Sequence, residues 1–139
     1  MKSKLILAFM AVAISLCLFA CSPASKQVSV DVTCGQLSKH AHITKAIQVP
    51  AGDSFTLSLC SNPTAEFRWS EAQISDQTAL EQVDRKFVPR KEGQAGGREV
   101  WTFKTLKEGT STISMEYIRP GKGEKPTRTF VLTVEVLLG

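Results

Sequence analysis

Apolar and polar residues alternate strictly through most of this 139-residue chain, and this alternation limits its fold more than any other feature. In FTLSLC, Phe55, Leu57 and Leu59 alternate with Thr and Ser, and STISMEY and TFVLTVEVL repeat the pattern. A period of two residues is typical of a strand with one buried and one solvated face. Seven or eight such segments, separated by turn sequences such as PAGD and KEGQAGG, predict an all-β, antiparallel sandwich.

One segment, TALEQVDRKF, fits two structures. Leu80, Val83 and Phe87 have the spacing of an amphipathic helix, whereas Val83, Arg85 and Phe87 alternate as in a strand. The neighbouring segments are all strands. We therefore predict a strand over residues 79–88.

The first residues form a secretory signal, because MKSK is basic and LILAFMAVAISLCLFA is apolar and ends in small residues. Its end, LFAC, resembles the cleavage box of bacterial lipoproteins, which implies a lipid on Cys21; plain signal cleavage nearby is the alternative. By the same resemblance, Ser22 favours the outer membrane. The expected organisation is a signal over 1–21, a short tether over 22–26 and one domain over 27–139, exported and lipid-anchored in a bacterial cell envelope.

Two cysteines, Cys34 and Cys60, remain in the expected mature chain. In an exported protein a disulfide is the default for such a pair. It would close a loop of about 26 residues and contribute on the order of 3 kcal/mol. A metal site with His40 and His42 is the rival interpretation, but their spacing matches no common zinc pattern. We expect no metal and no cofactor.

The charge pattern argues against nucleic-acid binding. The leader holds Lys2 and Lys4, so 15 of the 17 basic residues remain beside 13 acidic ones, and the two signs are interleaved. Nothing in the pattern indicates an obligate second copy, so we expect a monomer.

Three unusual loops share one expected position. They are SNPTAE at 61–66, RKEGQAGG at 90–97 and RPGKGEKP at 119–126. Two predicted strands separate the first from the second, and two more separate the second from the third. A chain that crosses a sandwich twice returns to the same end, so we expect the loops side by side. Loops rich in Gly, Pro and Asn are common in sandwiches, and this chemistry alone indicates no more than a contact surface.

The segments NPTAEFRW, GQAGGREVWTF and YIRPGK together resemble the chagasin-type inhibitors of papain-like cysteine proteases, over roughly residues 45–137. The resemblance implies an immunoglobulin-like sandwich whose three loops enter the protease cleft, with the first loop over the catalytic cysteine. It assigns protease contact to Asn62, Pro63, Thr64, Ala65, Glu66, Gly93, Gly96, Gly97, Arg119 and Pro120. Arg119 is expected to present a charged fork beside the stiffening Pro120.

Phe67 and Trp69 follow the first loop and alternate with Arg68. Both aromatic side chains are expected to pack beneath the loop as supports, with Trp69 in the core.

Three positions depart from the family pattern. Ala65 and Glu66 replace a threonine and a glycine, and Gly121 replaces an aromatic residue. These changes keep a second function open, a non-inhibitory envelope binding or structural module on the same fold. An enzyme is the third class, but a nucleophile would need a nearby base, and the only histidines are His40 and His42. We therefore expect no catalytic residues.

Overall fold

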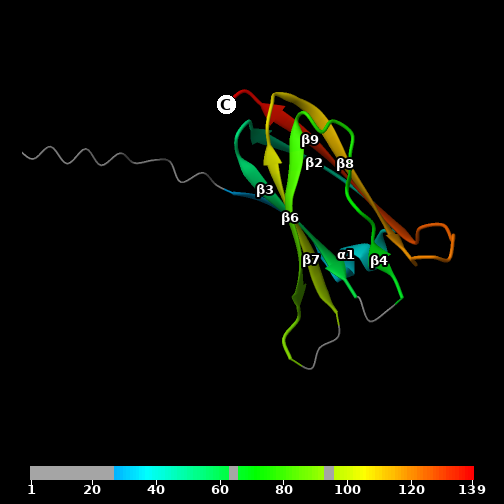
Figure 1. Ribbon diagram of the computed structural model, residues 1–139. Helices are drawn as coiled ribbons and strands as arrows, with labels where there is room; N and C mark the ends of the chain where they lie inside the picture. Colours follow the sequence, from blue (N-terminus) through cyan, green and yellow to red (C-terminus); the bar gives the residue numbers. More distant parts are fainter. Residues whose placement is uncertain (1–26, 63–65, 93–95) are drawn as a thin grey trace, which may run out of the picture.

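The computed structural model describes residues 27–62, 66–92 and 96–139 (Figure 1). Within these ranges the chain forms nine strands and one short helix: β1 (Val28–Val32), α1 (Cys34–Lys39), β2 (His42–Pro50), β3 (Ser54–Ser61), β4 (Arg68–Trp69), β5 (Gln73–Ile74), β6 (Leu80–Pro89), β7 (Gly97–Thr105), β8 (Gly109–Ile118) and β9 (Arg128–Leu137). The structure has two short strands, β4 and β5, where the sequence predicts a single strand. This division accounts for the ninth strand.

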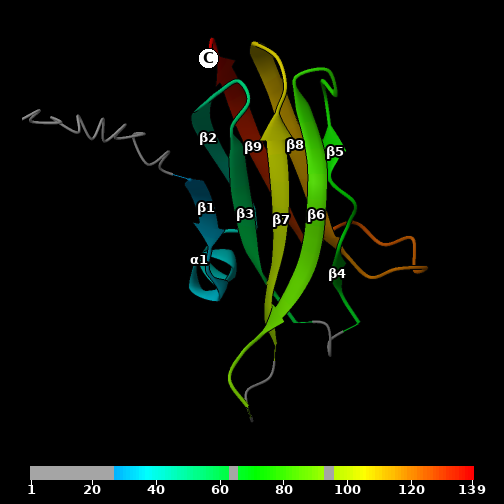
Figure 2. The same cartoon turned by 60° about the vertical axis from the view of Figure 1, so that its left-hand side comes forward.

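The strands form two sheets packed face to face (Figure 2). The first sheet has the order β1-β3-β7-β6, and the second has the order β2-β9-β8-β4, with β5 also paired to β8. The predicted immunoglobulin-like sandwich is confirmed. It is not wholly antiparallel, because β1 pairs with β3, and β2 with β9, in parallel. One strand, β2, crosses back between β1 and β3, so β1 and β3 run in the same direction.

The core lies between the sheets and follows the predicted alternation. Phe55 and Phe103 stack in the first sheet with ring centroids 5.3 Å apart. The second sheet contributes fully buried side chains from alternate positions of β8 and β9: Ile113, Met115, Phe130, Leu132, Val134 and Val136. Burial of these apolar faces supplies the main driving force for the fold.

Strand β6 confirms the strand predicted over 79–88, but it contains an irregularity. Its register against β7 shifts between Gln82 and Asp84, so Val83 is 50% exposed. Such a bulge reverses which side chains face inward. Arg85 consequently lies over the buried ring of Trp101, 5.0 Å from its centroid.

The alternation in VSVDVTC predicts a strand that continues to Cys34, but helix α1 begins at that residue. Thr33 caps it by accepting a hydrogen bond from the Gln36 backbone at 3.2 Å, and the Gln36 side chain accepts one from the Thr33 backbone at 2.9 Å. This reciprocal pair is a capping box. The cap turns the chain so that Leu37 enters the core. In the part of the chain that the structure describes, no helix is both long and apolar enough to span a membrane.

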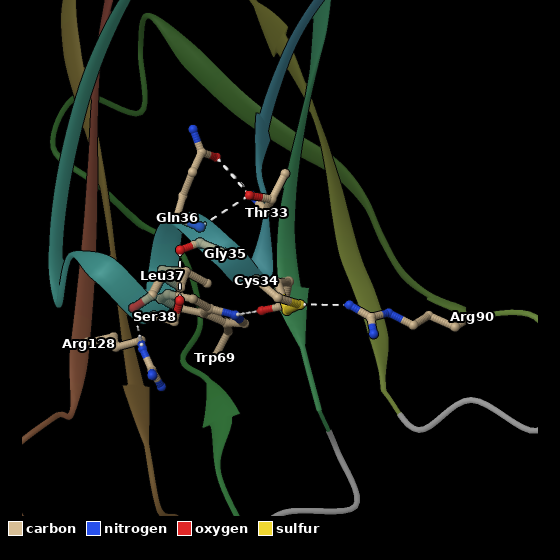
Figure 3. The surroundings of a disulfide bond; sticks show 10 residues. Thr33, Cys34, Gly35, Gln36, Leu37, Ser38, Trp69, Arg90 and Arg128 are labelled. Atoms are coloured by element: carbon tan, nitrogen blue, oxygen red, sulfur yellow. Dashed lines mark hydrogen bonds between the residues drawn. A yellow bond between two sulfur atoms is a disulfide. The ribbon is translucent and has the colours of Figure 1, made fainter.

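The predicted disulfide is confirmed and joins α1 to β3 through Cys34 and Cys60 (Figure 3). It fastens β1 and α1, which precede most of the fold, to an inner strand of the first sheet. The bond therefore restricts a loop of 26 residues in the unfolded chain.

Replacing both cysteines by alanine is expected to lower the free energy of unfolding by about 3 kcal/mol, because the unfolded chain regains the entropy of the closed loop. Urea denaturation under oxidising conditions measures the change. A reducing agent should bring the unaltered protein to the level of the double variant and leave the variant unchanged. Equal transition midpoints for the two proteins would contradict this account.

Candidate functional site

Three loops meet at one end of the sandwich, which we call the loop end. The first loop is 62–67 between β3 and β4, the second is 90–96 between β6 and β7, and the third is 119–127 between β8 and β9. In Figures 1 and 2 the described residues of the first two loops and the third loop lie toward the same end, with the third projecting to the side. This is the arrangement predicted from the number of crossings.

The first loop contacts both of the others. Gly96 of the second loop lies against the first: a Cβ atom built there would be 3.2 Å from the Ser61 carbonyl oxygen and 3.7 Å from the Asn62 side chain. On the other side, the Glu66 carboxylate lies 3.3 Å from Nε of Arg119 in the third loop. The described residues of the first loop thus connect those of the second and third loops.

Several predicted contact residues lie outside the described residues, namely Pro63, Thr64, Ala65 and Gly93, as does the predicted lipidation site Cys21. The flanking Asn62 and Glu66 are described and exposed.

An aromatic group supports the first loop, as predicted. Trp69 is 2% exposed, and its indole Nε1 donates a hydrogen bond to the Cys60 carbonyl oxygen at 2.9 Å. Tyr117 of β8 packs against both aromatic residues that follow the loop, with its ring 5.1 Å from that of Trp69 and 5.7 Å from that of Phe67. The root of the loop therefore rests on side chains of the second sheet.

Arg119, expected to present a charged fork, also makes contacts within the chain. Its guanidinium lies 4.9 Å above the Phe67 ring, and its Nη1 is 3.7 Å from the Glu124 carboxylate. The 3.3 Å contact with Glu66 is an ion pair without hydrogen-bond alignment, since the buried Nε has no such partner. With 32% of its side chain exposed, Arg119 links the first and third loops.

The glycines at the end of the second loop have structural causes. Gly97 is buried at the start of β7, and a Cβ there would lie only 2.3 Å from the Val88 carbonyl oxygen. Gly96 has a φ of 83°, which side-chain-bearing residues rarely adopt. Close packing against β6 and the first loop therefore accounts for both, whatever partner binds.

Gly121 gives the third loop its own shape. The Lys122 backbone N–H donates to the Arg119 carbonyl oxygen at 3.4 Å, which closes a turn with exposed Pro120 at its second position. Gly121 takes the third position with a φ of 79°. Turns of this kind need a residue with positive φ there, usually glycine. An aromatic residue, as in the family pattern, would be strained in this turn.

A group centred on Arg85 joins the sheets beneath the loop end. Its guanidinium donates to the Glu99 carboxylate at 2.7 Å, to the Glu71 carboxylate at 3.1 Å and to the Trp69 carbonyl oxygen at 2.9 Å. Sequence reasoning missed this group because each acidic partner lies 14 residues away and no local pattern marks it. The bulge in β6 is what turns Arg85 inward.

The histidines and cysteines of the described residues do not gather into a reactive centre. His40 caps the end of α1, and His42 begins β2 with Nδ1 2.7 Å from the Thr129 hydroxyl oxygen; both are exposed. Cys34 and Cys60 are joined in the disulfide. Among the described residues, no group of three or more His, Cys, Asp or Glu side chains is placed to hold a metal ion.

Replacing Trp69 by phenylalanine is expected to destabilise the protein by about 1 kcal/mol more than the same change at Trp101, measured as free energies of unfolding. Both indoles are buried, so the two changes delete the same buried atoms. Only Trp69 donates a hydrogen bond, since Trp101 Nε1 has no partner. Equal losses for the two variants would show that the bond to Cys60 contributes nothing.

The comparisons with known proteins agree with this geometry. Residues 48–134 match the family described as chagasin family peptidase inhibitor I42. Amoebiasin-2 of Entamoeba histolytica is 31% identical over 102 residues, which cover 70% of this chain and 80% of that protein.

Two solved structures are similar along most of the chain. The cysteine protease inhibitor EhICP2 of Entamoeba histolytica has a TM-score of 0.57 at 25% identity and covers 81% of this chain and 98% of its own. PbICP-C, solved in complex with falcipain-2, has a TM-score of 0.57 at 15% identity and covers 81% and 99%, a likeness of fold. The family and these neighbours are protease inhibitors, not enzymes, as the sequence predicts. With its loops gathered at one end and most of its length matched, this chain belongs to the chagasin family of peptidase inhibitors.

Proposed function

We propose that this protein inhibits papain-like cysteine proteases without covalent chemistry, by placing its loop end in the catalytic cleft. The observation that carries the proposal is that the first loop contacts both of the others. The family match and the likeness to EhICP2, a cysteine protease inhibitor, support the class of target, and PbICP-C, which has a similar fold, was solved in complex with falcipain-2.

A wedge of this kind acts by being fixed before it binds. The Trp69 bond, the stacked rings of Phe67 and Tyr117 and the Arg119 ion pairs hold the edges of the loops in place in the free protein. Less conformational entropy is then lost on association. In the bound state the first loop would cover the catalytic cysteine, and the other two would contact the sides of the cleft.

Titrating active papain with the protein is expected to remove activity in proportion to the inhibitor added, until the enzyme is saturated. When the inhibitor in the complex is denatured, its chain should be recovered uncleaved and papain should regain its activity, because no covalent bond forms. Arg119→Ala, which removes the link between two loops and a contact residue, should weaken inhibition at least about ten-fold. The matched control is Lys104→Ala on β7, near the opposite end.

If neither papain nor any cathepsin of a panel were inhibited at micromolar concentration, inhibition of this protease class would be rejected. In that case the alternative function, a non-inhibitory envelope module, is favoured by two features. Gly121 changes the shape of the third loop, and Glu66 already pairs with Arg119, the cation of that loop. A non-inhibitory envelope module would then be shown by an envelope protein captured by the unaltered chain and lost with Arg119→Ala.

We also propose that the protein is exported and carried on a lipid at Cys21 in a bacterial envelope, on the support of the LFAC segment that follows the apolar leader. The geometry is compatible with this: Val28 pairs with Phe55 near the start of β3, so β1 begins at the end opposite the loops. A lipid about seven residues earlier, within roughly 25 Å of extended chain, would leave the loop end facing away from the membrane.

Replacing Cys21 by serine is expected to move the protein from the membrane fraction of the expressing bacteria to the soluble fraction and to abolish labelling by an alkyne fatty acid. Cys60→Ser is the control, because it removes a thiol that is not predicted to carry lipid. Undiminished labelling of the Cys21 variant would exclude this site.

A further inference from the structure

A basic groove runs beside the second loop on the first sheet. Its volume is about 730 Å³. The end of β1 and the start of α1 form one wall, β3 and β7 contribute to the lining, and the end of β6 with the first residues of the second loop forms the other wall. The disulfide lies within the lining, and Figure 3 shows Arg90 extending across to Cys34.

Three cations line this groove against one acid. Arg90, Lys91 and Arg98 are exposed, and Asp31 is the acidic member of the lining. Among the described residues, none of the three cations forms an ion pair. Their positive charge is therefore not neutralised within the described part of the chain.

Arg90 is held by two hydrogen bonds, although most N–H donors of its guanidinium are not used in them. Its backbone N–H donates to the Gly96 carbonyl oxygen at 3.2 Å, and its Nη2 donates to Cys34 Sγ at 3.0 Å. Sulfur is a weak acceptor, and a guanidinium has five donors. A planar, oriented guanidinium of this kind is suited to a carboxylate.

Two of the arginines near the loop end, Arg85 and Arg119, differ in this respect. Arg85 pairs with Glu71 and Glu99, and Arg119 pairs with Glu66 and Glu124. A partner meeting those groups would have to displace a carboxylate that is already present. The groove offers cations to a partner without that cost.

We propose that this groove accepts an acidic surface segment of the protease bound at the loop end. The proposal rests on the proposed function and adds the chemistry of the partner: the preferred proteases carry carboxylates beside the cleft, on the side that meets the second loop. Gly97 lines the groove and adjoins the second loop, so the two surfaces are continuous. An anionic membrane is the less suitable occupant, because the lipid proposed at Cys21 would place the membrane near the end where β1 begins, opposite the loops.

The test uses a groove variant that carries both Lys91→Gln and Arg98→Gln. Its control, the matched pair, carries both Lys104→Gln and Lys107→Gln, away from the loop end. All proteins are produced from the full-length sequence. Association rates and inhibition constants are measured against a papain-like protease with an acidic cleft margin. The groove variant is expected to inhibit about ten-fold more weakly at low salt, mainly through slower association, and the difference should shrink in about 0.5 M NaCl.

A second arm uses the same protease after amides replace the carboxylates beside its cleft. The groove variant should inhibit this altered protease as strongly as the unaltered inhibitor does. The matched pair should inhibit as strongly as the unaltered inhibitor in both arms. If the unaltered protein inhibits but the groove variant is equally strong at low salt, the groove proposal is overturned and the proposed function stands. Failure of the unaltered protein against every papain-like protease overturns both. Loss of phosphatidylserine vesicle binding in the groove variant, with inhibition unchanged, also overturns the proposal and assigns the groove to a membrane.

Discussion

The hydrogen bond from the Trp69 indole to the Cys60 carbonyl oxygen is the contact on which the loop end depends. Cys60 is the next-to-last residue of β3, one residue away from the first loop, and its side chain is bound to Cys34. One residue is therefore held by the second sheet through its backbone and by α1 through its sulfur. The first loop starts from this fixed point and reaches Glu66, where the ion pair to Arg119 restrains it again.

Much of the fold could be predicted because burial repeats every second residue and turns separate the strands. The same alternation does not indicate the two places where the structure departs from regular strands, namely helix α1 and the bulge in β6. VSVDVTC continues the strand pattern to Cys34, yet the Thr33–Gln36 capping box ends the extended chain and starts a helix. The capping signal is present in the sequence, but only two residues carry it. The bulge at Gln82 and Asp84 has no comparable local signal, and it depends on pairing with β7.

The position of the site could be predicted from the sequence, but the contacts between its charged side chains could not. Counting crossings brings the three loops to one end, since it needs only the number of strands. The partners of individual charges depend on contacts across the fold, and nothing in the first loop shows that Glu66 meets Arg119. The basic groove has the same origin: its lining combines residues near Asp31 with residues near Arg90, and only the finished sheet brings them together.

The two tryptophans occupy unlike surroundings. The Trp69 indole is hydrogen-bonded at the root of the first loop, whereas the Trp101 N–H is unpaired and a guanidinium lies over its ring. The chain thus contains two indole fluorophores, and only the Trp69 indole is bonded to the strand that leads into the first loop. In a Trp101→Phe background, excitation selective for tryptophan would report on Trp69 alone and so give a label-free signal of events at the loops.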